Sequence, residues 1–169
     1  MPITRGHVLL TPRQHREKLS HCKTSEAAVL GAWLGVLSRA VMRGVGALAL
    51  GLAESDTKET KQQLIEQEEE KEEEVGAVQD WNVVQNNGAR AAQVVNHVHY
   101  HIIPRPGEVP DLRARSWTMF GRGQRGDLDE EEALRTRDRI RWEIGREVRM
   151  LSLADRRILG VEDGGESRL

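Results

Sequence analysis

A run of ten residues, from Val94 to Ile103, strongly limits what this chain can fold into. It is rich in β-branched side chains and stops at Pro104, which predicts a β-strand. Three of the chain's six histidines occupy alternate positions within it: His97, His99 and His101. Alternate side chains of a strand share one face, about 6.6 Å apart, so we expect three imidazoles on one side of a sheet. The residues between them are expected to pack into the opposite side: Val98, Tyr100 and Ile102. Because histidine rarely fills a core in this way, we interpret the histidine face as a functional site.

Length and composition place the chain among proteins with one domain, or one domain and an extension. It has 169 residues, 38% of them hydrophobic and 31% charged. No apolar run approaches the roughly 20 residues of a membrane span, so no membrane association is predicted. The first 20 residues lack the pattern of a signal peptide, and the single cysteine, Cys22, excludes an internal disulfide. We expect a cytoplasmic or nuclear protein.

The net charge of −2 conceals an uneven distribution. Between Glu54 and Glu74 lie ten acidic residues and three lysines, so the rest of the chain carries a net charge of +5. A mildly basic body suits an anionic ligand such as a nucleotide, but it is not basic enough to indicate nucleic-acid binding. Residues 47–78 are predicted to be a tolerated insertion, either a solvated helix or disordered.

Other elements follow from hydrophobic periodicity and turn residues. Residues 6–12 predict a strand ended by Pro12, and Trp81–Gln85 predicts a second strand, followed by a turn at 86–88. That turn should bring the second strand alongside the histidine strand. Residues 25–45 predict an amphipathic helix closed by two glycines, Gly44 and Gly46, with these apolar residues at helical spacing: Leu30, Trp33, Leu34, Leu37, Val41 and Val45.

Beyond the histidine strand the sequence predicts one more helix. It runs over residues 127–153, with an acidic first turn and with Ile140, Ile144, Val148 and Leu151 on one face. The tail to Leu169 is expected to fray. The predicted fold class is therefore α+β, an antiparallel sheet with one long helix packed on it and a C-terminal helical extension. We divide it into a domain of residues 1–106 and an extension of residues 107–169.

The histidine run resembles the signature of the histidine-triad (HIT) family, His-φ-His-φ-His-φ-φ, where φ is apolar. Two further stretches strengthen the resemblance. The segment from Gly6 to His15, Gly-His-Val-Leu-Leu-Thr-Pro-Arg-Gln-His, resembles the family's upstream strand and loop, and Asn87-Gly88 with Gln93 resembles the loop before the triad. The resemblance covers roughly residues 5–46 and 80–106. It does not include the family's N-terminal hairpin, and the family's Gly-Gln-Ser/Thr is replaced by Ala92-Gln93-Val94.

The resemblance implies a nucleotide hydrolase or transferase that acts at an α-phosphate. By resemblance, His99 is the nucleophile that forms a covalent nucleotidyl-histidine, His101 tunes and orients it, and His97 and His15 complete the hydrogen-bond network around the phosphate. An imidazole is nucleophilic near pH 7, which agrees with that role. The loop residues expected to contact ribose or phosphate are Asn86, Asn87, Gly88 and Gln93. A purine nucleotide substrate and a homodimer are implied, and no cofactor is required.

Three alternatives stay open at the level of sequence. A catalytically weak or inactive nucleotide-binding module would follow from the missing hairpin and from Val94, which has no hydroxyl. A metal site could form if two triad histidines and His15 shared one ion, and no metal is our expectation. A role at nucleic-acid ends could use the basic, aromatic segment 113–125, but no zinc-finger spacing accompanies it. We expect His7 to be a packing or surface residue.

Overall fold

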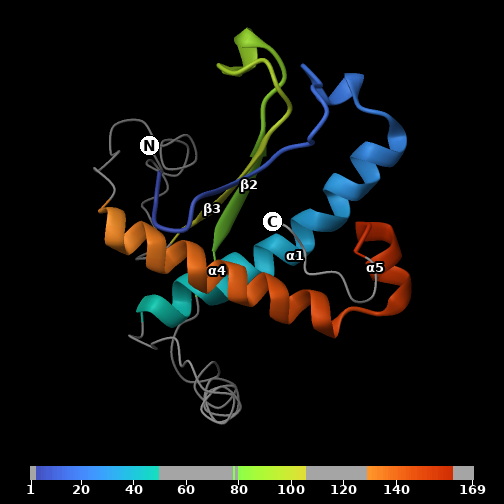
Figure 1. Ribbon diagram of the computed structural model, residues 1–169. Coiled ribbons are helices and arrows are strands. Elements are labelled where there is room, and N and C mark those ends of the chain that lie inside the picture. The colour runs from blue at the N-terminus through green and yellow to red at the C-terminus, as the bar shows by residue number, and fades with distance from the viewer. Residues whose placement is uncertain (1–2, 50–77, 79, 106–128, 162–169) are drawn as a thin grey trace.

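The computed structural model describes residues 3–49, 78, 80–105 and 129–161 (Figure 1). Within these residues, three strands form one antiparallel sheet, a long helix packs on it, and two further helices follow toward the C-terminus. The predicted α+β class is confirmed.

The strand that carries part of the histidine run lies at the centre of the sheet. The order is β1-β3-β2 and both pairs are antiparallel, with β1 at Val8–Leu10, β2 at Trp81–Gln85 and β3 at Tyr100–Pro104. Ile102 pairs with Val8 on one side and with Val83 on the other. The bounds of β2 are those predicted from the sequence, and its placement beside the histidine-bearing strand is confirmed.

The first strand is shorter than the predicted residues 6–12. Pro12 has no N–H to donate to a neighbouring strand. The Thr11 hydroxyl donates to the Val98 carbonyl at 2.8 Å, so this residue contacts the histidine run through its side chain. The ladder therefore ends at Leu10, and a loop begins there.

The histidine strand is also shorter than predicted, because β3 begins only at Tyr100. His97 and His99 thus precede the strand, and the prediction of a strand from Val94 is wrong. The reason lies in the loop after β1, since the Val98 N–H donates to the Arg16 carbonyl at 2.7 Å. Val98 and Ile102 are fully buried, as predicted for the face opposite the histidines.

Helix α1 (Thr24–Ala49) lies across the sheet and continues past the two glycines predicted to end it. A Cβ placed on Gly44 would lie 3.1 Å from Cγ1 of Ile140, so the glycine permits a close approach of a second helix. The last residues of α1, 47–49, fall within the predicted insertion 47–78. Val78, the last residue of that insertion, packs against the core. The remainder of that insertion, residues 50–77, lies outside the described residues.

Two helices follow the sheet, α4 (Glu130–Met150) and α5 (Leu153–Leu159). Asp129 caps α4 by accepting the Glu132 N–H at 2.8 Å, and three glutamates follow in its first turn, as predicted. The prediction that the chain frays beyond residue 153 is wrong for residues 154–159, which belong to α5. Gly160, with φ 69°, caps the C-terminus of this helix. The Trp33 indole N–H donates to the Leu159 carbonyl at 3.3 Å and so links α5 to α1.

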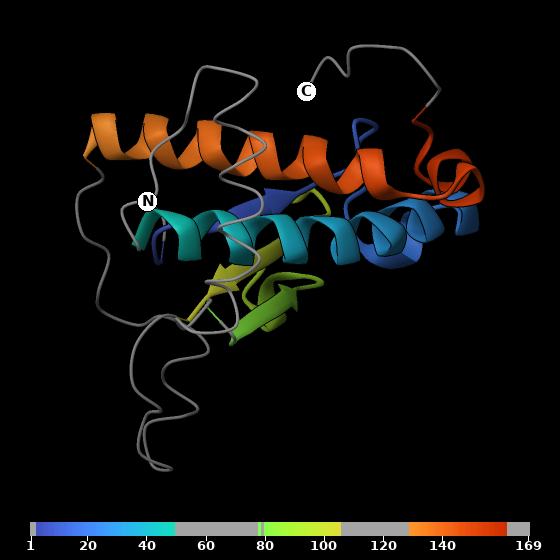
Figure 2. The same cartoon turned by 90° about the horizontal axis from the view of Figure 1, so that it is seen from below.

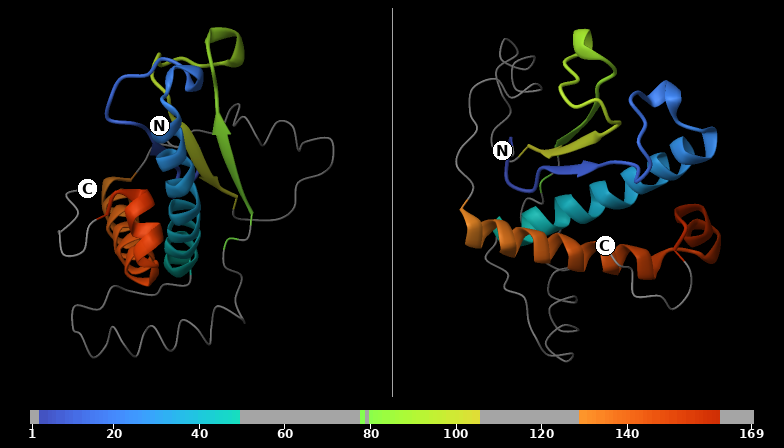
Figure 3. Two further views of the ribbon diagram at one scale, coloured as in Figure 1. Left: turned by 90° about the vertical axis from the view of Figure 1, so that its right-hand side faces the viewer. Right: turned by 45° about the horizontal axis from the view of Figure 1, so that its top comes forward.

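Figures 2 and 3 show α4 alongside α1, on the side away from β2. The buried face of α4 differs from the prediction. Of the four apolar residues expected there only Ile140 is buried, and the other buried positions are mostly charged: Arg139, Glu143, Arg146 and Glu147. Four helical positions therefore bury charge where apolar side chains were expected.

The core lies between the sheet, α1 and α4. Its buried residues are Leu37, Val41, Met42, Val45, Ile102 and Ile140. By length and composition alone α1 could cross a membrane, yet half of its apolar stretch is buried inside the protein. Core helices of soluble proteins meet the same criterion, and the α1 residues in this core account for much of its apolar character.

Candidate active site

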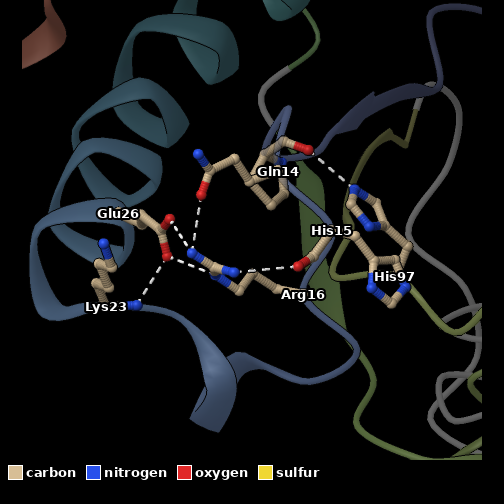
Figure 4. Close-up of polar contacts among 7 residues, drawn as sticks. Gln14, His15, Arg16, Lys23, Glu26 and His97 are labelled. Atoms are coloured by element: carbon tan, nitrogen blue, oxygen red, sulfur yellow. Dashed lines mark hydrogen bonds and ion pairs between the residues drawn. The ribbon is translucent and has the colours of Figure 1, made fainter.

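The four histidines predicted to form the site lie in two ring pairs. The rings of His99 and His101 meet edge to face, with centroids 4.9 Å apart. The rings of His15 and His97 are stacked, with centroids 5.3 Å apart, and Figure 4 shows His15 reaching this position from the loop after β1. The chain thus brings together residues more than eighty positions apart, although only His101 belongs to a strand.

The hydrogen bond of His99 identifies its tautomer. Its Nδ1 lies 2.7 Å from the carbonyl oxygen of His97. A carbonyl oxygen can only accept, so Nδ1 carries the proton and donates it. In the neutral ring Nε2 then holds an unshared electron pair. The His99 side chain is half-buried.

A short chain of hydrogen bonds identifies the tautomer of His101. The Ile3 N–H donates to His7 Nδ1 at 3.1 Å, so His7 carries its proton on Nε2. His7 Nε2 then donates to His101 Nδ1 at 2.9 Å, which leaves the His101 proton on Nε2. The two neighbouring triad rings therefore present opposite properties, a lone pair on His99 and an N–H on His101.

His7, which we expected to be a packing or surface residue, thus lies beside the triad and contacts His101. The strand register held a signal that could have found it. Leu9 pairs with His101, so His7, two residues before Leu9, projects to the same face of the sheet. Pairing the two predicted strands would have placed His7 beside the triad.

His97 and His15 both hold backbone segments in place. His97 Nε2 donates to the Pro12 carbonyl at 2.9 Å, and His15 Nε2 donates to the Asn96 carbonyl at 2.7 Å. Each ring thus connects the loop after β1 to the segment before β3. These contacts fix where the triad lies, and the phosphate-contacting role of the two rings stays a prediction.

The loop residues expected to contact ribose or phosphate differ in how far they are buried and in their hydrogen bonds. Gln93 is 4% exposed, and its amide donates to the Glu17 carbonyl at 2.7 Å and accepts the Gly88 N–H. The exposed Asn87 accepts the Leu19 N–H at 2.8 Å, and Asn86 is half-buried. Gln93 and Asn87 therefore hold the loop in shape, and their contact with a ligand stays a prediction.

One ion pair lies close to the histidines. The carboxylate of Glu26 accepts two hydrogen bonds from the Arg16 guanidinium and one from the Lys23 N–H (Figure 4). The Arg16 hydrogen bonds, followed by the Lys23 N–H, lower the pKa of Glu26 to about 2, and the bond to Glu26 raises the pKa of Arg16. Within the described part of the chain, no three histidine, cysteine or acidic side chains are arranged to hold a metal ion.

Comparison with known proteins finds a family match. A model of the HIT domain matches residues 1–108. The chain is 27% identical over 107 residues to adenosine 5'-monophosphoramidase hnt1 of Schizosaccharomyces pombe, covering 63% of this chain and 54% of that protein. It is 32% identical over 111 residues to adenosine 5'-monophosphoramidase HNT1 of Candida albicans, covering 66% and 55%.

A solved structure shares the fold. The hypothetical histidine triad nucleotide-binding protein from Sulfolobus tokodaii superposes with a TM-score of 0.54 at 19% identity, over 86% of this chain and 73% of that one. The chain spans about half the length of the curated relatives that it matches. The domain match covers most of this chain and includes all the histidines described above, and the chain therefore belongs to the histidine-triad (HIT) family.

Proposed function

We propose that this chain is a nucleotide hydrolase or transferase that attacks an α-phosphate through a covalent nucleotidyl-histidine on His99. The observation that carries the proposal is the hydrogen bond from His99 Nδ1 to the His97 carbonyl, since it leaves Nε2 as a nucleophile. An orienting partner on the far nitrogen is what an activated imidazole requires.

The proposed reaction has two displacements. In the first, His99 Nε2 forms a bond to the α-phosphorus, and the bond to the leaving group breaks with its electron pair. His101 donates a hydrogen bond from Nε2 to the atom on which negative charge develops. In the second, a water oxygen attacks phosphorus, the P–N bond breaks and its electron pair returns to Nε2. The proton lost by the water balances the one that the leaving group takes up.

The relatives support a substrate class. Two are named as adenosine 5'-monophosphoramidases, which favours a purine nucleotide joined through a phosphoramidate bond. Dinucleoside polyphosphates offer the same reacting centre. The mildly basic body of the chain, with a net charge of +5 outside the acidic segment, suits either anion.

A homodimer is part of the proposal. In the described residues β2 pairs with β3 alone, and we expect its other edge to meet a second copy. Trp81 and Val83 on that strand are 44% and 43% exposed, and burying them would favour association. Light scattering should give twice the chain mass, and a single chain mass would contradict this part.

The test is to trap the covalent species. The wild-type protein, His99→Ala and the control His21→Ala are incubated with α-labelled ATP or diadenosine polyphosphate, with and without EDTA, and quenched. His21 is exposed and belongs to neither ring pair, so its variant should behave as wild type. We expect an acid-labile label on the wild type and on His21→Ala, independent of EDTA, and none on His99→Ala.

Two results would contradict the proposal. Absence of label on a wild type that still binds nucleotide by calorimetry would indicate a catalytically weak binding module. Val94, which is 92% exposed and has no hydroxyl to donate to a phosphate, would then help to explain the weak catalysis. Label that disappears with EDTA would indicate metal-dependent chemistry.

A further inference from the structure

The loop that follows β1 holds the backbone between His97 and His99. The backbone N–H of Val98 donates to the Arg16 carbonyl at 2.7 Å, and its carbonyl accepts the Thr11 hydroxyl at 2.8 Å. Val98 is fully buried and lies between His97 and His99. Both backbone groups of this residue are thus bonded to one loop, and a shift of the loop would carry His99 with it.

The same loop is held to α1 through the side chain of Arg16 (Figure 4). Its Nε donates to Oε2 of Glu26 at 2.8 Å, and Nη2 donates to Oε1 at 2.6 Å, which makes the contact bidentate. Glu26 lies in the first turn of α1, where its Oε2 also accepts the Lys23 N–H at 2.8 Å. The carboxylate is therefore fixed to the helix before it meets the guanidinium.

Additional bonds fix the Arg16 side chain within its own loop. Nη1 donates to the His15 carbonyl at 3.2 Å, and Nη2 donates to the Gln14 side chain at 3.0 Å. A planar guanidinium in a bidentate contact restricts direction as well as distance, and a lysine ammonium does not. Arg16 therefore connects three parts of the molecule: its side chain reaches α1, its own loop carries His15, and its carbonyl holds Val98.

We propose that the Arg16–Glu26 pair is a positioning pair for His99, which transmits the fixed place of the α1 N-terminus through the loop to the nucleophile. The kinetic part of this inference rests on the proposed function. The pair stays ionised at neutral pH, because each partner's hydrogen bonds favour its charged form. The hydrogen bonds of the two side chains are made with groups other than the triad rings, so we expect both to act through the backbone of residues 15–17 and Val98.

Small displacements of a nucleophile are costly, since a shift of about 1 Å can lower a rate by about 10²-fold. For Arg16→Ala we expect kcat to fall about tenfold while KM changes by less than about threefold, because ligand contacts remain but the attack geometry loosens. Arg16→Lys keeps the positive charge but loses the bidentate contact, so its kcat should lie between those of Arg16→Ala and wild type. Glu26→Gln should resemble Arg16→Lys.

The matched control is Arg137→Ala. Arg137 also donates to a neighbouring carboxylate, that of Asp138 at 2.7 Å, but on the exposed surface of α4. Its removal should leave kcat and KM at wild-type values.

A second readout does not depend on catalysis. Amide hydrogen exchange at Val98 should become about tenfold faster in Arg16→Ala, because the acceptor for that N–H is no longer held. Exchange at Ile102 in the centre of β3 should stay within about twofold of wild type. If Arg16→Ala fails to fold, Arg16→Lys and Glu26→Gln carry the same comparison with smaller shifts.

Each outcome decides the inference. Unchanged Val98 exchange in a folded variant overturns it, and so does a raised KM with unchanged kcat, which would assign the pair to ligand binding. Faster Val98 exchange with a lower kcat supports it. If the wild type shows no turnover, the proposed function fails on that result, and the exchange measurement still decides whether the pair positions Val98.

Discussion

Helix α1 carries arginine–glutamate contacts at both of its ends, and the two regions behave in opposite ways. At the first turn, Glu26 meets Arg16 with both side chains 21% exposed. Toward the other end, Arg43 of α1 meets Glu143 and Glu147 of α4, where Glu143 is 0% exposed. The two arginines are similarly exposed, 21% for Arg16 and 23% for Arg43, so the difference lies in the carboxylate, which keeps contact with water in Glu26 and is buried in Glu143.

The pKa values show what burial changes. Hydrogen bonds from Arg16 and from a backbone N–H lower the pKa of Glu26 to about 2. Burial raises the pKa of Glu143, and this desolvation outweighs the opposing effects of three arginines: Arg139, Arg146 and Arg43. An ion pair that keeps contact with water can hold a loop at little cost, whereas a buried one must offset the loss of hydration of each charge. The Arg16–Glu26 pair, at the end of α1 beside the histidines (the site end), is therefore suited to positioning the loop. The contacts of Arg43, at the end of α1 that meets α4 (the α4 end), fix how the two helices pack.

The largest effect is expected at the buried end. Glu143→Ala would leave Arg139 and Arg146 without the carboxylate that they face, and removing one partner of a buried ion pair costs about 3–5 kcal/mol. Urea unfolding should show this loss, while the kcat of the remaining folded protein stays near that of wild type. Glu131→Ala, on the exposed face of α4, should change the free energy of unfolding by less than about 0.5 kcal/mol.

That result would sharpen the comparison by separating stability from rate. If Glu143→Ala instead lowered kcat in a fully folded sample, the α4 end would be coupled to the histidines, and the division between the two regions would be wrong.

The next effect is expected at the site end. His7→Ala removes the donor that keeps the His101 proton on Nε2, and loss of one positioned proton donor typically costs about 10²-fold in rate. The loss in kcat should be larger for a nucleotide with a poor leaving group than for one with a good leaving group, because the latter needs less help from His101. Leu9→Ala, at an exposed position on the same face, serves as the control.

An equal loss for both leaving groups would contradict the donor role of His101. If the free energy of unfolding fell enough to explain the loss of activity, His7 would have a structural role, like the buried charged residues of α4.

Local patterns in the sequence predicted much of this fold. Turn residues and β-branched runs gave β2 its observed bounds, and helical spacing placed the buried face of α1. The short β3 could not be read from its own residues, because the groups that hold Val98 lie more than eighty positions earlier, on Thr11 and Arg16. A strand-like run became an irregular segment through contacts that are not local.

The prediction of the buried face of α4 was wrong for a similar reason. Its pattern of isoleucine, valine and leucine predicted an apolar contact, but three charged residues at neighbouring positions are more deeply buried than Ile140: Arg139, Glu143 and Glu147. Their partners include Arg39 and Arg43, about a hundred residues away on α1. The four histidines named from spacing and resemblance lie in two ring pairs, and the position of His7 follows once the register of β1 and β3 is known.

The smallest effect is a difference in pH dependence between the two glutamates. Glu26 interacts electrostatically with Arg16, Lys23 and Cys22, and its pKa falls from an ordinary 4.5 to about 2 in the folded protein. Its contribution is present above pH 4.5 and is lost as the pH falls toward 2. The free energy of unfolding of wild type minus that of Glu26→Gln should therefore shrink on acidification.

Glu143 should give the opposite slope. Because its folded pKa lies above 4.5, the folded state binds more protons than the unfolded state just above that pH, and stability decreases as the pH rises through this interval. The difference between wild type and Glu143→Gln should thus shrink with increasing pH above 4.5. Urea unfolding of the three proteins between pH 3 and pH 7 measures both slopes. Slopes of the same sign would mean that burial does not separate the two ends of α1, and the surface pair could then no longer be distinguished from a structural one by its electrostatics.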